Sequence, residues 1–416
     1  MKILFLTDNF PPESNAPASR TYEHCREWVK KGADITVITC TPNFPEGKVF
    51  PGYKNKFYQK EEMDGIRVIR VWTYITPNRG LTPRILDYLS FCISGFIASL
   101  FVKTDIIIAT SPQLFTAVSG YLASVFKGKP WIMEIRDLWP ESIKAVEAMR
   151  ESIIIKMLDR LVFFLYRHAT KLVVVTDSFK RRMIALGNDP DKTFVIKNGV
   201  MLDQFQAREK NQRLINDLGL QDKFIVAYIG THGMAHKLDF ILDAAVSVHD
   251  PEIHFLFVGT GAMKGRLVKQ AEELQLKNVT LLDAVPKQQV ADYISISDVS
   301  LINLRKSKTF TKVIPSKIFE NAAMAKPILL GVEGEAQSII ESYGAGLCYE
   351  PENELDFLNK LQQMKQDRTA YRQYQEGCQN MARSFNRQAL AEEMYDVLEF
   401  VLAKPVLSPE EEKTGV

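Results

Sequence analysis

Residues 315–332 read Pro-Ser-Lys-Ile-Phe-Glu-Asn-Ala-Ala-Met-Ala-Lys-Pro-Ile-Leu-Leu-Gly-Val and combine a helix, a strand and a ligand site. Pro315 has a fixed φ and no backbone N–H, which suits the first position of a helix, and Pro327 ends that helix before an apolar strand. The helix start offers free N–H groups, the Ser316 hydroxyl and the Lys317 ammonium to a phosphate. Glu320 lies one turn further, where its carboxylate can accept a hydrogen bond from a sugar hydroxyl. The segment therefore predicts a pocket for a nucleotide sugar.

Short apolar runs alternate with helical patterns along most of the chain, which is typical of βα units and parallel sheets. The first predicted series of strands is 3–7, 35–39, 66–72, 105–109, 131–134, 172–175 and 194–196. The second series is 224–229, 254–258, 279–282, 299–302, 328–332 and 346–349. A turn at Asn198-Gly199-Val200 separates the two series. The prediction is an α/β protein with two doubly wound, Rossmann-like domains.

The length of 416 residues also favours more than one hydrophobic core. We predict an N-terminal domain over 1–200 and a C-terminal domain over 201–385. Residues 386–403 form a last helix that we expect to pack back across the domain boundary. Residues 404–416 are polar and are predicted to be disordered.

Charge is distributed unevenly between the two halves. Residues 1–200 carry 28 Lys and Arg against 20 Asp and Glu, whereas residues 201–416 carry 24 against 30. A basic first half suits an anionic partner such as a lipid surface or a diphosphate, and an ordinary solvated surface is an equal alternative. The charge is too dilute for a nucleic-acid-binding module.

The cysteines and the apolar stretches indicate in which cellular compartment the protein works. The five cysteines are scattered and include no CxxC pair, which argues for reduced thiols in a cytoplasmic protein and against a disulfide frame or a zinc ribbon. The apolar N-terminus is too short for a signal peptide. The longest uncharged helical stretch, 88–102, is shorter than a membrane span.

In parallel sheets, ligands bind at the carboxyl ends of the strands. The loop after the first strand is rich in proline, carries Ser14 and Asn15, and leads to Arg20 at the start of the next helix. It lacks the G-x-G-x-x-G that a dinucleotide requires, which disfavours a nicotinamide dehydrogenase. Ser111, after the strand at 105–109, could contact an acceptor, and helix capping is its alternative role.

The loop at 134–142 places four charges and Trp139 directly after an apolar strand. Such charges are costly to bury unless they bind a ligand or pair with each other. Asp137 is a candidate general base or anchor for an acceptor hydroxyl. An ion pair between Arg136 and Asp137 is the alternative.

Glycine-rich loops follow the first two strands of the second half. Gly233 lets backbone approach a phosphate, and Lys237 supplies a positive charge. His232 and His236 are four residues apart without an HExxH motif, so packing histidines are favoured over a zinc pair. Further candidates contact the base, ribose or diphosphate, with plain connecting loops as the alternative: Gly259, Val285 and Arg305.

Together these residues resemble the family 4 glycosyltransferases, which are retaining enzymes with the GT-B fold. The resemblance is strongest to the bacterial branch that builds surface polysaccharide, including enzymes described as L-fucosamine transferases. The matching elements, in order, are Phe10-Pro11-Pro12-Glu13 with Arg20, Arg136-Asp137-Leu138-Trp139-Pro140, Asn198-Gly199-Val200, Lys237, and Pro315-Ser316-Lys317 with Phe319-Glu320.

The resemblance implies that a nucleotide sugar, in particular a UDP-sugar, binds to the second domain and an acceptor to the first. It implies retention at the anomeric carbon with neither a bound metal nor a cofactor, the leaving diphosphate being neutralised by cationic side chains and a helix end. The predicted catalytic residues are Arg136, Asp137 and Lys237. The predicted donor site comprises Gly233, Lys237, Gly259, Val285, Arg305, Ser316, Lys317 and Glu320. The predicted acceptor site comprises Ser14, Asn15, Arg20, Ser111 and Trp139.

Three positions depart from the family pattern. Many members have Arg where Thr231 stands, and Arg305 is the candidate replacement for that cation. Many have Glu where Lys312 stands, which is compatible with an altered donor such as a deoxy or N-acetylated sugar. Many have His where Arg136 stands. These departures keep two alternatives open, a nucleotide-sugar 2-epimerase of the same fold and a nucleotide-sugar-binding protein without transferase activity.

The predicted acceptor is a lipid-linked saccharide at the inner face of the membrane. The basic first half and two apolar helices, 85–102 and 153–166, motivate this prediction. Burial of both helices inside the first domain is the alternative. We therefore expect a cytoplasmic protein that associates with the plasma membrane, and nothing in the sequence predicts an oligomeric state.

Overall fold

The computed structural model describes residues 1–44, 46–76, 81–139, 141 and 153–403. The chain divides into two compact units. Unit 1 comprises Met1–Lys197 together with the chain from Gln388 onward, and unit 2 is Asn198–Arg387. The chain thus leaves unit 1 directly before the Asn198-Gly199-Val200 turn and returns to it at the start of its last helix. The predicted tail, 404–416, lies outside the described residues.

The described residues of unit 1 form an eight-stranded sheet in the order β3-β4-β2-β1-β5-β6-β7-β8. The strands are β1 (Lys2–Leu6), β2 (Asp34–Cys40), β3 (Tyr58–Met63), β4 (Ile66–Val71), β5 (Ile106–Thr110), β6 (Trp131–Ile135), β7 (Lys171–Val174) and β8 (Thr193–Val195). Neighbouring strands run parallel except β3, which pairs antiparallel with β4. The sequence missed β3 because its residues, Tyr-Gln-Lys-Glu-Glu-Met, are mostly polar and alternate only between exposed and partly buried.

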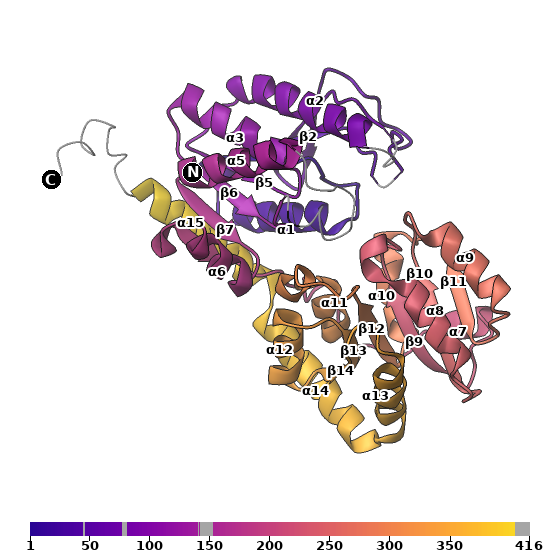
Figure 1. Ribbon diagram of the computed structural model, residues 1–416. Coiled ribbons are helices and arrows are strands. Elements are labelled where there is room, and N and C mark those ends of the chain that lie inside the picture. The colour runs from indigo at the N-terminus through magenta and orange to yellow at the C-terminus, as the bar shows by residue number, and fades with distance from the viewer. Residues whose placement is uncertain (45, 77–80, 140, 142–152, 404–416) are drawn as a thin grey trace. The chain divides into compact units, whose positions relative to one another are not determined.

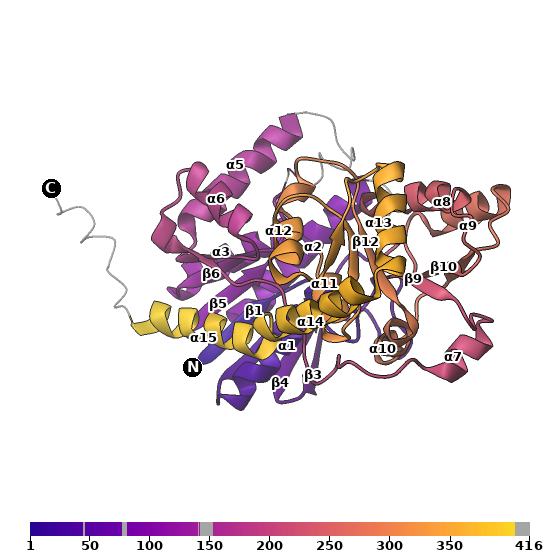
Figure 2. The same cartoon turned by 90° about the horizontal axis from the view of Figure 1, so that it is seen from below.

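Helices cover both faces of this sheet (Figures 1 and 2). One face carries α2 (Leu81–Leu100), α3 (Leu114–Lys127) and α5 (Ile153–His168), and the other carries α1 (Ala16–Lys30) and α15 (Arg387–Ala403). The buried Trp28 of α1 donates its indole N–H to the carbonyl of Ala391 at 2.7 Å, which fixes α15 against unit 1. α6 (Asp177–Ala185) connects β7 to β8.

The described residues of unit 2 form a six-stranded parallel sheet in the order β11-β10-β9-β12-β13-β14. The strands are β9 (Phe224–Ile229), β10 (Ile253–Val258), β11 (Val279–Leu282), β12 (Val299–Asn303), β13 (Ile328–Gly331) and β14 (Gly346–Cys348). The helices are α7 (Gln212–Asp217), α8 (Leu238–Val246), α9 (Lys264–Glu273), α10 (Lys287–Ile296), α11 (Lys317–Ala323), α12 (Glu335–Tyr343), α13 (Glu354–Gln366) and α14 (Arg368–Ser384). The two parallel α/β sheets confirm the predicted fold class.

The segment at 315–332 folds into a helix and a strand, with one correction. Helix α11 begins at Lys317 with Ser316 as its N-cap, so Pro315 precedes the helix and does not occupy its first position. The helix ends at Ala323, and Ala325 takes a left-handed conformation with φ of +53°. The buried Lys326 ammonium then donates to the carbonyls of Ser295 and Ser297 at 2.7 and 2.9 Å. These bonds satisfy a buried cation and fix the turn into β13.

Helix α2 matches the apolar helix that the sequence predicts near residues 85–102. Among the described residues, no helix combines the length and the apolar character that crossing a bilayer requires.

Candidate functional site

Two glycine-rich loops meet at the carboxyl ends of β9 and β10. Gly230 follows β9 with φ of +143°, and Gly259 follows β10 with φ of +154°. A Cβ atom on Gly259 would lie 1.9 Å from the carbonyl oxygen of Gly230, so the two backbones are in direct contact. Only glycine permits this approach and this conformation. The two glycines therefore allow the loops after β9 and β10 to pack backbone against backbone at this edge of the sheet.

Lys317 extends from the first residue of α11 over the Gly230 loop. Its Nζ atom donates to the Tyr228 hydroxyl at 2.6 Å and lies 3.9 Å from the centre of the Tyr228 ring. A Cβ atom on Gly230 would lie 2.2 Å from Cε of Lys317, so the missing side chain leaves room for this lysine. The Tyr228 hydroxyl in turn donates to the carbonyl of Thr231 at 2.7 Å. The ammonium is thus held in a defined position.

The environment of Lys317 prepares it for an anion. Burial disfavours the charged form and lowers the pKa of Lys317 to about 7, although Glu320 acts in the opposite direction. An anionic group beside Nζ would stabilise the ammonium and raise that pKa again. The sequence identified Lys317 as a phosphate ligand but missed Tyr228, because a tyrosine inside an apolar strand gives no signal of function.

The two histidines of the same loop are neutral packing groups. His232 is fully buried, and neither of its ring nitrogens has a hydrogen-bond partner among the described residues. Burial, with Lys264 and Lys317 nearby, lowers the pKa of His232 to about 4. Burial and Lys317 likewise lower the pKa of His236 to about 3. Both rings are therefore uncharged near pH 7.

Lys237 and Arg305 are attached to the same loop system. Lys237 adopts a left-handed conformation with φ of +46°, and its Nζ atom forms an ion pair with Asp239 at 2.8 Å. The backbone N–H of Arg305 donates to the carbonyl of Ala235 at 2.8 Å. The buried Asn303 donates to the carbonyl of His236 at 2.9 Å. The structure thus brings the Gly230–Lys237 loop, Arg305 and Lys317 to one edge of the unit 2 sheet.

The remaining predicted donor residues lie at or near this edge. Gly259 is part of the backbone contact described above. Ser316 and Glu320 lie at the start of α11 with partly exposed side chains. Val285 is partly buried against the apolar cluster that includes Val258.

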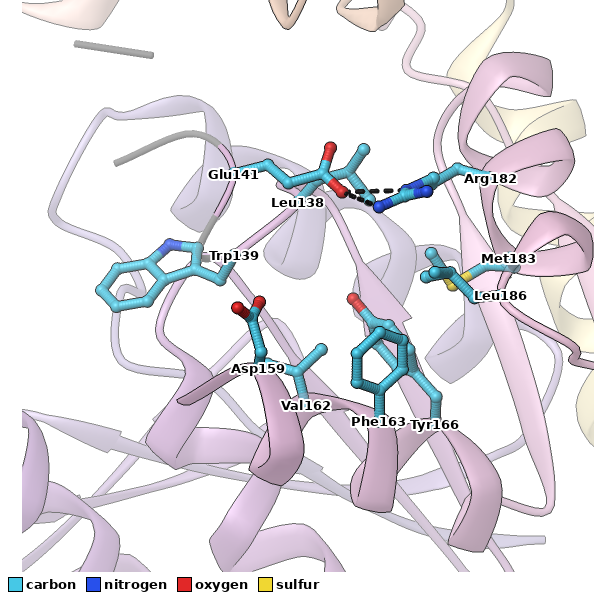
Figure 3. Close-up of a pocket in the computed structure, with 10 residues that line it drawn as sticks. All are labelled: Leu138, Trp139, Glu141, Asp159, Val162, Phe163, Tyr166, Arg182, Met183 and Leu186. Atoms are coloured by element: carbon cyan, nitrogen blue, oxygen red, sulfur yellow. Dashed lines mark hydrogen bonds and ion pairs between the residues drawn. The ribbon is translucent and has the colours of Figure 1, made fainter. Parts of the chain in front are cut away.

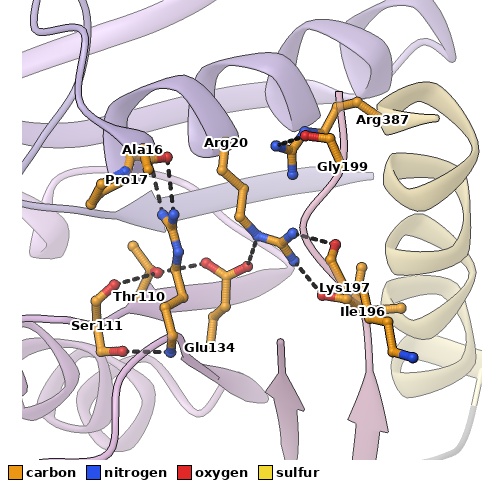
Figure 4. A network of polar contacts seen from close by, with 11 residues as sticks. Ala16, Pro17, Arg20, Thr110, Ser111, Glu134, Ile196, Lys197, Gly199 and Arg387 are labelled. Atoms are coloured by element: carbon orange, nitrogen blue, oxygen red, sulfur yellow. Dashed lines mark hydrogen bonds and ion pairs between the residues drawn. The ribbon is translucent and has the colours of Figure 1, made fainter. Parts of the chain in front are cut away.

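In unit 1, Arg20 forms a buried network rather than a ligand contact (Figure 4). Its guanidinium is 1% exposed and donates to Glu134 Oε1 at 2.8 Å and to the carbonyls of Ile196 and Lys197 at 2.9 and 2.8 Å. Thr110 donates to the other Glu134 oxygen at 2.5 Å. Burial opposes ionisation of Glu134, but the charges of Arg20 and Arg136 hold its pKa below the ordinary value. The Arg20 side chain is therefore engaged inside the unit, and its contact with the acceptor stays a prediction.

Ser111 and Asn15 also have internal roles. The Ser111 hydroxyl is buried and accepts a hydrogen bond from the backbone N–H of Arg136 at 2.7 Å. Asn15 caps α1 by accepting from the N–H of Ala18 at 2.9 Å. The acceptor roles of Ser111 and Asn15 stay predictions beside these internal contacts, and Ser14 is exposed. Helix capping is the alternative that the structure favours for Asn15.

Arg136 joins the loop after β6 to the start of α1. Its guanidinium donates to the carbonyls of Ala16 and Pro17 at 2.9 and 3.1 Å. The carbonyl of Asp137 accepts from the backbone N–H of Trp139 at 3.2 Å. Arg136 therefore positions the loop that carries Asp137 and Trp139.

A small pocket lies beside Trp139 (Figure 3). Its wall includes Trp139, Asp159 and Tyr166, and an ion pair between Glu141 and Arg182. Its volume is about 30 Å³. The ring of Trp139 also packs edge-on against Tyr88 of α2, with 6.0 Å between the ring centres.

The sequence missed a group of carboxylates directly after β1. Asp8 Oδ2 accepts from the side-chain amides of Gln113 at 2.5 Å and Asn9 at 3.1 Å. Burial, with Asp87 and Glu13 nearby, holds the pKa of Asp8 well above its ordinary value. Burial also raises the pKa of Glu13 to about 7. The position of Asp8 at the end of the first strand was the available signal.

The two family matches correspond to the two units of the chain. The family described as "Glycosyl transferase 4-like domain" matches residues 15–199, and the family described as "Glycosyl transferases group 1" matches residues 210–383. The chain is 25% identical over 365 residues to WcaI of Escherichia coli (strain K12), covering 85% of this chain and 89% of that protein. It is 26% identical over 264 residues to WbjE of Pseudomonas aeruginosa, covering 62% and 66%. The names of both relatives describe glycosyltransferases.

Solved structures show the same architecture. A sucrose-phosphate synthase from Thermosynechococcus elongatus superposes with a TM-score of 0.78 at 15% identity, covering 97% of this chain and 99% of that one. HepE from Anabaena, in complex with UDP-glucose, superposes with a TM-score of 0.72 at 16% identity, covering 96% and 99%. From both domain matches and this architecture we conclude that the chain is a glycosyltransferase with the GT-B fold.

Proposed function

We propose that this protein is a retaining glycosyltransferase that moves a sugar from a UDP-sugar to a lipid-linked intermediate of a surface polysaccharide. The observation that carries the proposal is Lys317, whose ammonium is held against Tyr228 beside the closely packed glycine loops after β9 and β10. A diphosphate placed beside the Lys317 ammonium would meet a positive charge at the start of α11.

The comparisons support a nucleotide-sugar donor and a role in polysaccharide biosynthesis. HepE has been solved with UDP and glucose, and a trehalose-6-phosphate protein from Escherichia coli with UDP-2-fluoro glucose. The names of WcaI and of TuaH from Bacillus subtilis assign them to colanic acid and teichuronic acid biosynthesis. Retention follows from what the resemblance to family 4 implies.

In the proposed mechanism, the base and ribose rest near Gly259, Val285 and Glu320, while Lys237 and Lys317 meet the diphosphate with Ser316 and Arg305. As the glycosidic bond breaks, negative charge grows on the leaving phosphate, where these donors stabilise it. The acceptor hydroxyl attacks from the face that the diphosphate leaves, and its proton passes to the leaving phosphate. We propose that the reaction needs neither a metal nor a cofactor.

The acceptor side is proposed to involve unit 1. Ser14 is exposed, and Trp139 and Asp137 lie on the loop that Arg136 holds. Asp137 is proposed to orient the acceptor hydroxyl. The lipid part of the acceptor would place the protein at the cytoplasmic face of the plasma membrane.

Lys237→Ala is expected to lower kcat by about 10²-fold while changing the Kd for UDP less than about threefold. The side chain is already paired with Asp239 in the free protein, so its largest gain comes when charge develops on the leaving phosphate. Initial rates and isothermal titration with UDP measure the two quantities. A kcat close to that of the wild type would remove Lys237 from the mechanism.

The affinity for UDP is expected to fall as the pH rises above 7. Because the pKa of Lys317 is about 7 in the free protein, binding to the ammonium form requires proton uptake at higher pH. The Kd should then rise by up to about tenfold per pH unit between about pH 7.5 and 9, because one proton is linked to binding. Titrations with wild type and Lys317→Met test this slope. An equally steep slope in Lys317→Met would contradict the assignment.

A thermal-shift screen of nucleotides and nucleotide sugars tests the donor class, because a bound donor stabilises by mass action. UDP or a UDP-sugar is expected to raise the midpoint of thermal unfolding more than other nucleotides do. With the donor identified, NMR of the product gives its anomeric configuration, and inversion would overturn the proposed retaining mechanism.

A further inference from the structure

The helix face of unit 1 that carries α2 exposes a continuous row of large apolar side chains. Along α2 the row is Leu86, Leu89, Ile93, Ile97 and Leu100, at steps of three or four residues, so they share one side of the helix. Ile93 and Ile97 are 61% and 51% exposed. Phe101 continues the row just beyond the end of the helix and is 81% exposed.

The neighbouring helices extend the same surface. α3 packs beside α2, with Phe96 against Phe126 at 5.2 Å between ring centres and the Ser119 hydroxyl donating to the carbonyl of Cys92 at 2.7 Å. Phe126, at the end of α3, is 69% exposed. On the other side of α3, Tyr121 contacts Phe164 of α5. Further exposed apolar side chains on these two helices are Val125, Ile153, Met157, Phe163 and Phe164.

This clustering is unlike the rest of the described surface. Of the 23 large apolar side chains that are exposed in the described residues, 12 lie between Leu86 and Phe164. Isolated exposed apolar residues are normal, but a large contiguous patch marks an interaction surface. We call this set, on α2, α3 and α5, the apolar face.

The charges around the apolar face identify the kind of partner. Within the described residues 83–139 and 153–171, the exposed ionisable side chains are all basic: Lys103, Lys129, Lys156, Arg160, Arg167 and His168. The carboxylates of the same ranges are partly or fully buried: Asp87, Asp105, Glu134, Asp137 and Asp159. Exposed apolar side chains together with exposed cations match an anionic lipid surface, in which the apolar groups enter the acyl boundary and the cations meet headgroups.

A second copy of the chain fits this surface less well. Pairing the apolar face with itself would bring two sets of exposed cations together without exposed carboxylates in the same ranges to compensate them. We propose that the apolar face docks on the anionic surface of a bilayer.

The location of the apolar face suits the proposed acceptor. Tyr88 lies on α2 between Leu86 and Leu89, and its ring contacts Trp139 on the loop after β6. Docking through α2 would therefore bring the bilayer close to the residues proposed to meet the acceptor. This inference deepens the proposed function and rests on the proposal that the acceptor is lipid-linked.

Vesicle flotation with the full chain tests the proposal, using phosphatidylcholine alone and phosphatidylcholine with phosphatidylglycerol. The wild type is expected to float with the anionic vesicles at low salt, and to float at least about tenfold less with neutral vesicles or at high salt. The double variant Ile93→Glu, Ile97→Glu is expected to bind anionic vesicles at least about tenfold more weakly. Lys103→Glu with Lys129→Glu should weaken binding to anionic vesicles specifically.

The matched control is Val246→Glu with Leu355→Glu, two residues of unit 2 that are 49% and 70% exposed. This control should float like the wild type, and circular dichroism melting verifies that each variant folds. The proposal is overturned if the wild type stays unbound, if Ile93→Glu, Ile97→Glu floats like the wild type, or if sedimentation shows a dimer that this variant dissociates. Flotation needs neither donor nor acceptor, so its failure is distinguishable from failure of the transferase proposal, which the nucleotide screen reports.

Discussion

Arg20→Met is expected to destabilise unit 1 by about 3–5 kcal/mol, because it leaves a buried carboxylate without its counter-charge. Arg20 and Glu134 are each 1% exposed, and the guanidinium also satisfies the carbonyls of Ile196 and Lys197. Methionine keeps much of the apolar stem but provides none of these hydrogen bonds. The loss of stability should appear as a lower midpoint of denaturant-induced unfolding.

Tryptophan fluorescence can follow this transition selectively. All four tryptophans precede Lys197 and therefore lie in unit 1: Trp28, Trp72, Trp131 and Trp139. A chain with two units need not unfold in one step, so a probe confined to one unit is preferable to a global one.

Two further variants define the outcome. Lys30→Met, on the exposed side of α1, removes a surface pair with Glu27 and should cost no more than about 1 kcal/mol. Adding Glu134→Gln to Arg20→Met removes the unpaired charge and should recover part of the lost stability. An unchanged midpoint for Arg20→Met would show that the network does not support unit 1.

Lys317→Met is expected to lower kcat/KM by about 10²–10³-fold, the largest effect of any single replacement in the proposed donor site. The variant keeps an apolar stem above the Gly230 loop but removes the charge held against Tyr228. Because the charge would act on a diphosphate in both the ground state and the transition state, we expect KM to rise as well as kcat to fall. Steady-state rates over a range of donor concentrations separate these contributions.

Lys308→Met is the matched control for Lys317→Met. Lys308 is exposed and lies nine residues before Lys317 in the chain, so its replacement should leave kcat/KM within about twofold of the wild type. Equal losses in both variants would indicate a general effect of charge rather than a positioned ammonium. Wild-type kcat/KM in Lys317→Met would contradict the donor site proposed here.

Strand periodicity predicted most of the fold because nearly every strand of the two parallel sheets is a short apolar run. The predicted ranges at 224–229 and 279–282 coincide with β9 and β11. The edge strand β3 escaped detection because edge strands need little apolar surface. The sequence predicted that α11 begins at Pro315. The helix begins at Lys317 because Ser316, rather than the residue before Pro315, is the N-cap.

The candidate site was harder to predict than the fold. Arg20, Asn15 and Ser111 all stand at loop positions where ligands usually bind, and position in the chain does not distinguish an internal hydrogen bond from a ligand contact. The contact of Lys317 with Tyr228 joins residues 89 positions apart, which no local pattern reveals. Lys317 itself was recognised because a lysine at a helix start near a glycine-rich loop has a physical reason to bind phosphate.

Acceptor-dependent release of UDP tests the central claim most directly. The purified protein is incubated with the UDP-sugar that stabilises it most, with and without a lipid-linked saccharide fraction, and free UDP is measured. The account predicts UDP release only with the acceptor fraction, at a rate that Lys317→Met reduces by about 10²-fold or more. UDP release at the same rate without acceptor, or epimerisation of the donor in place of transfer, would contradict it.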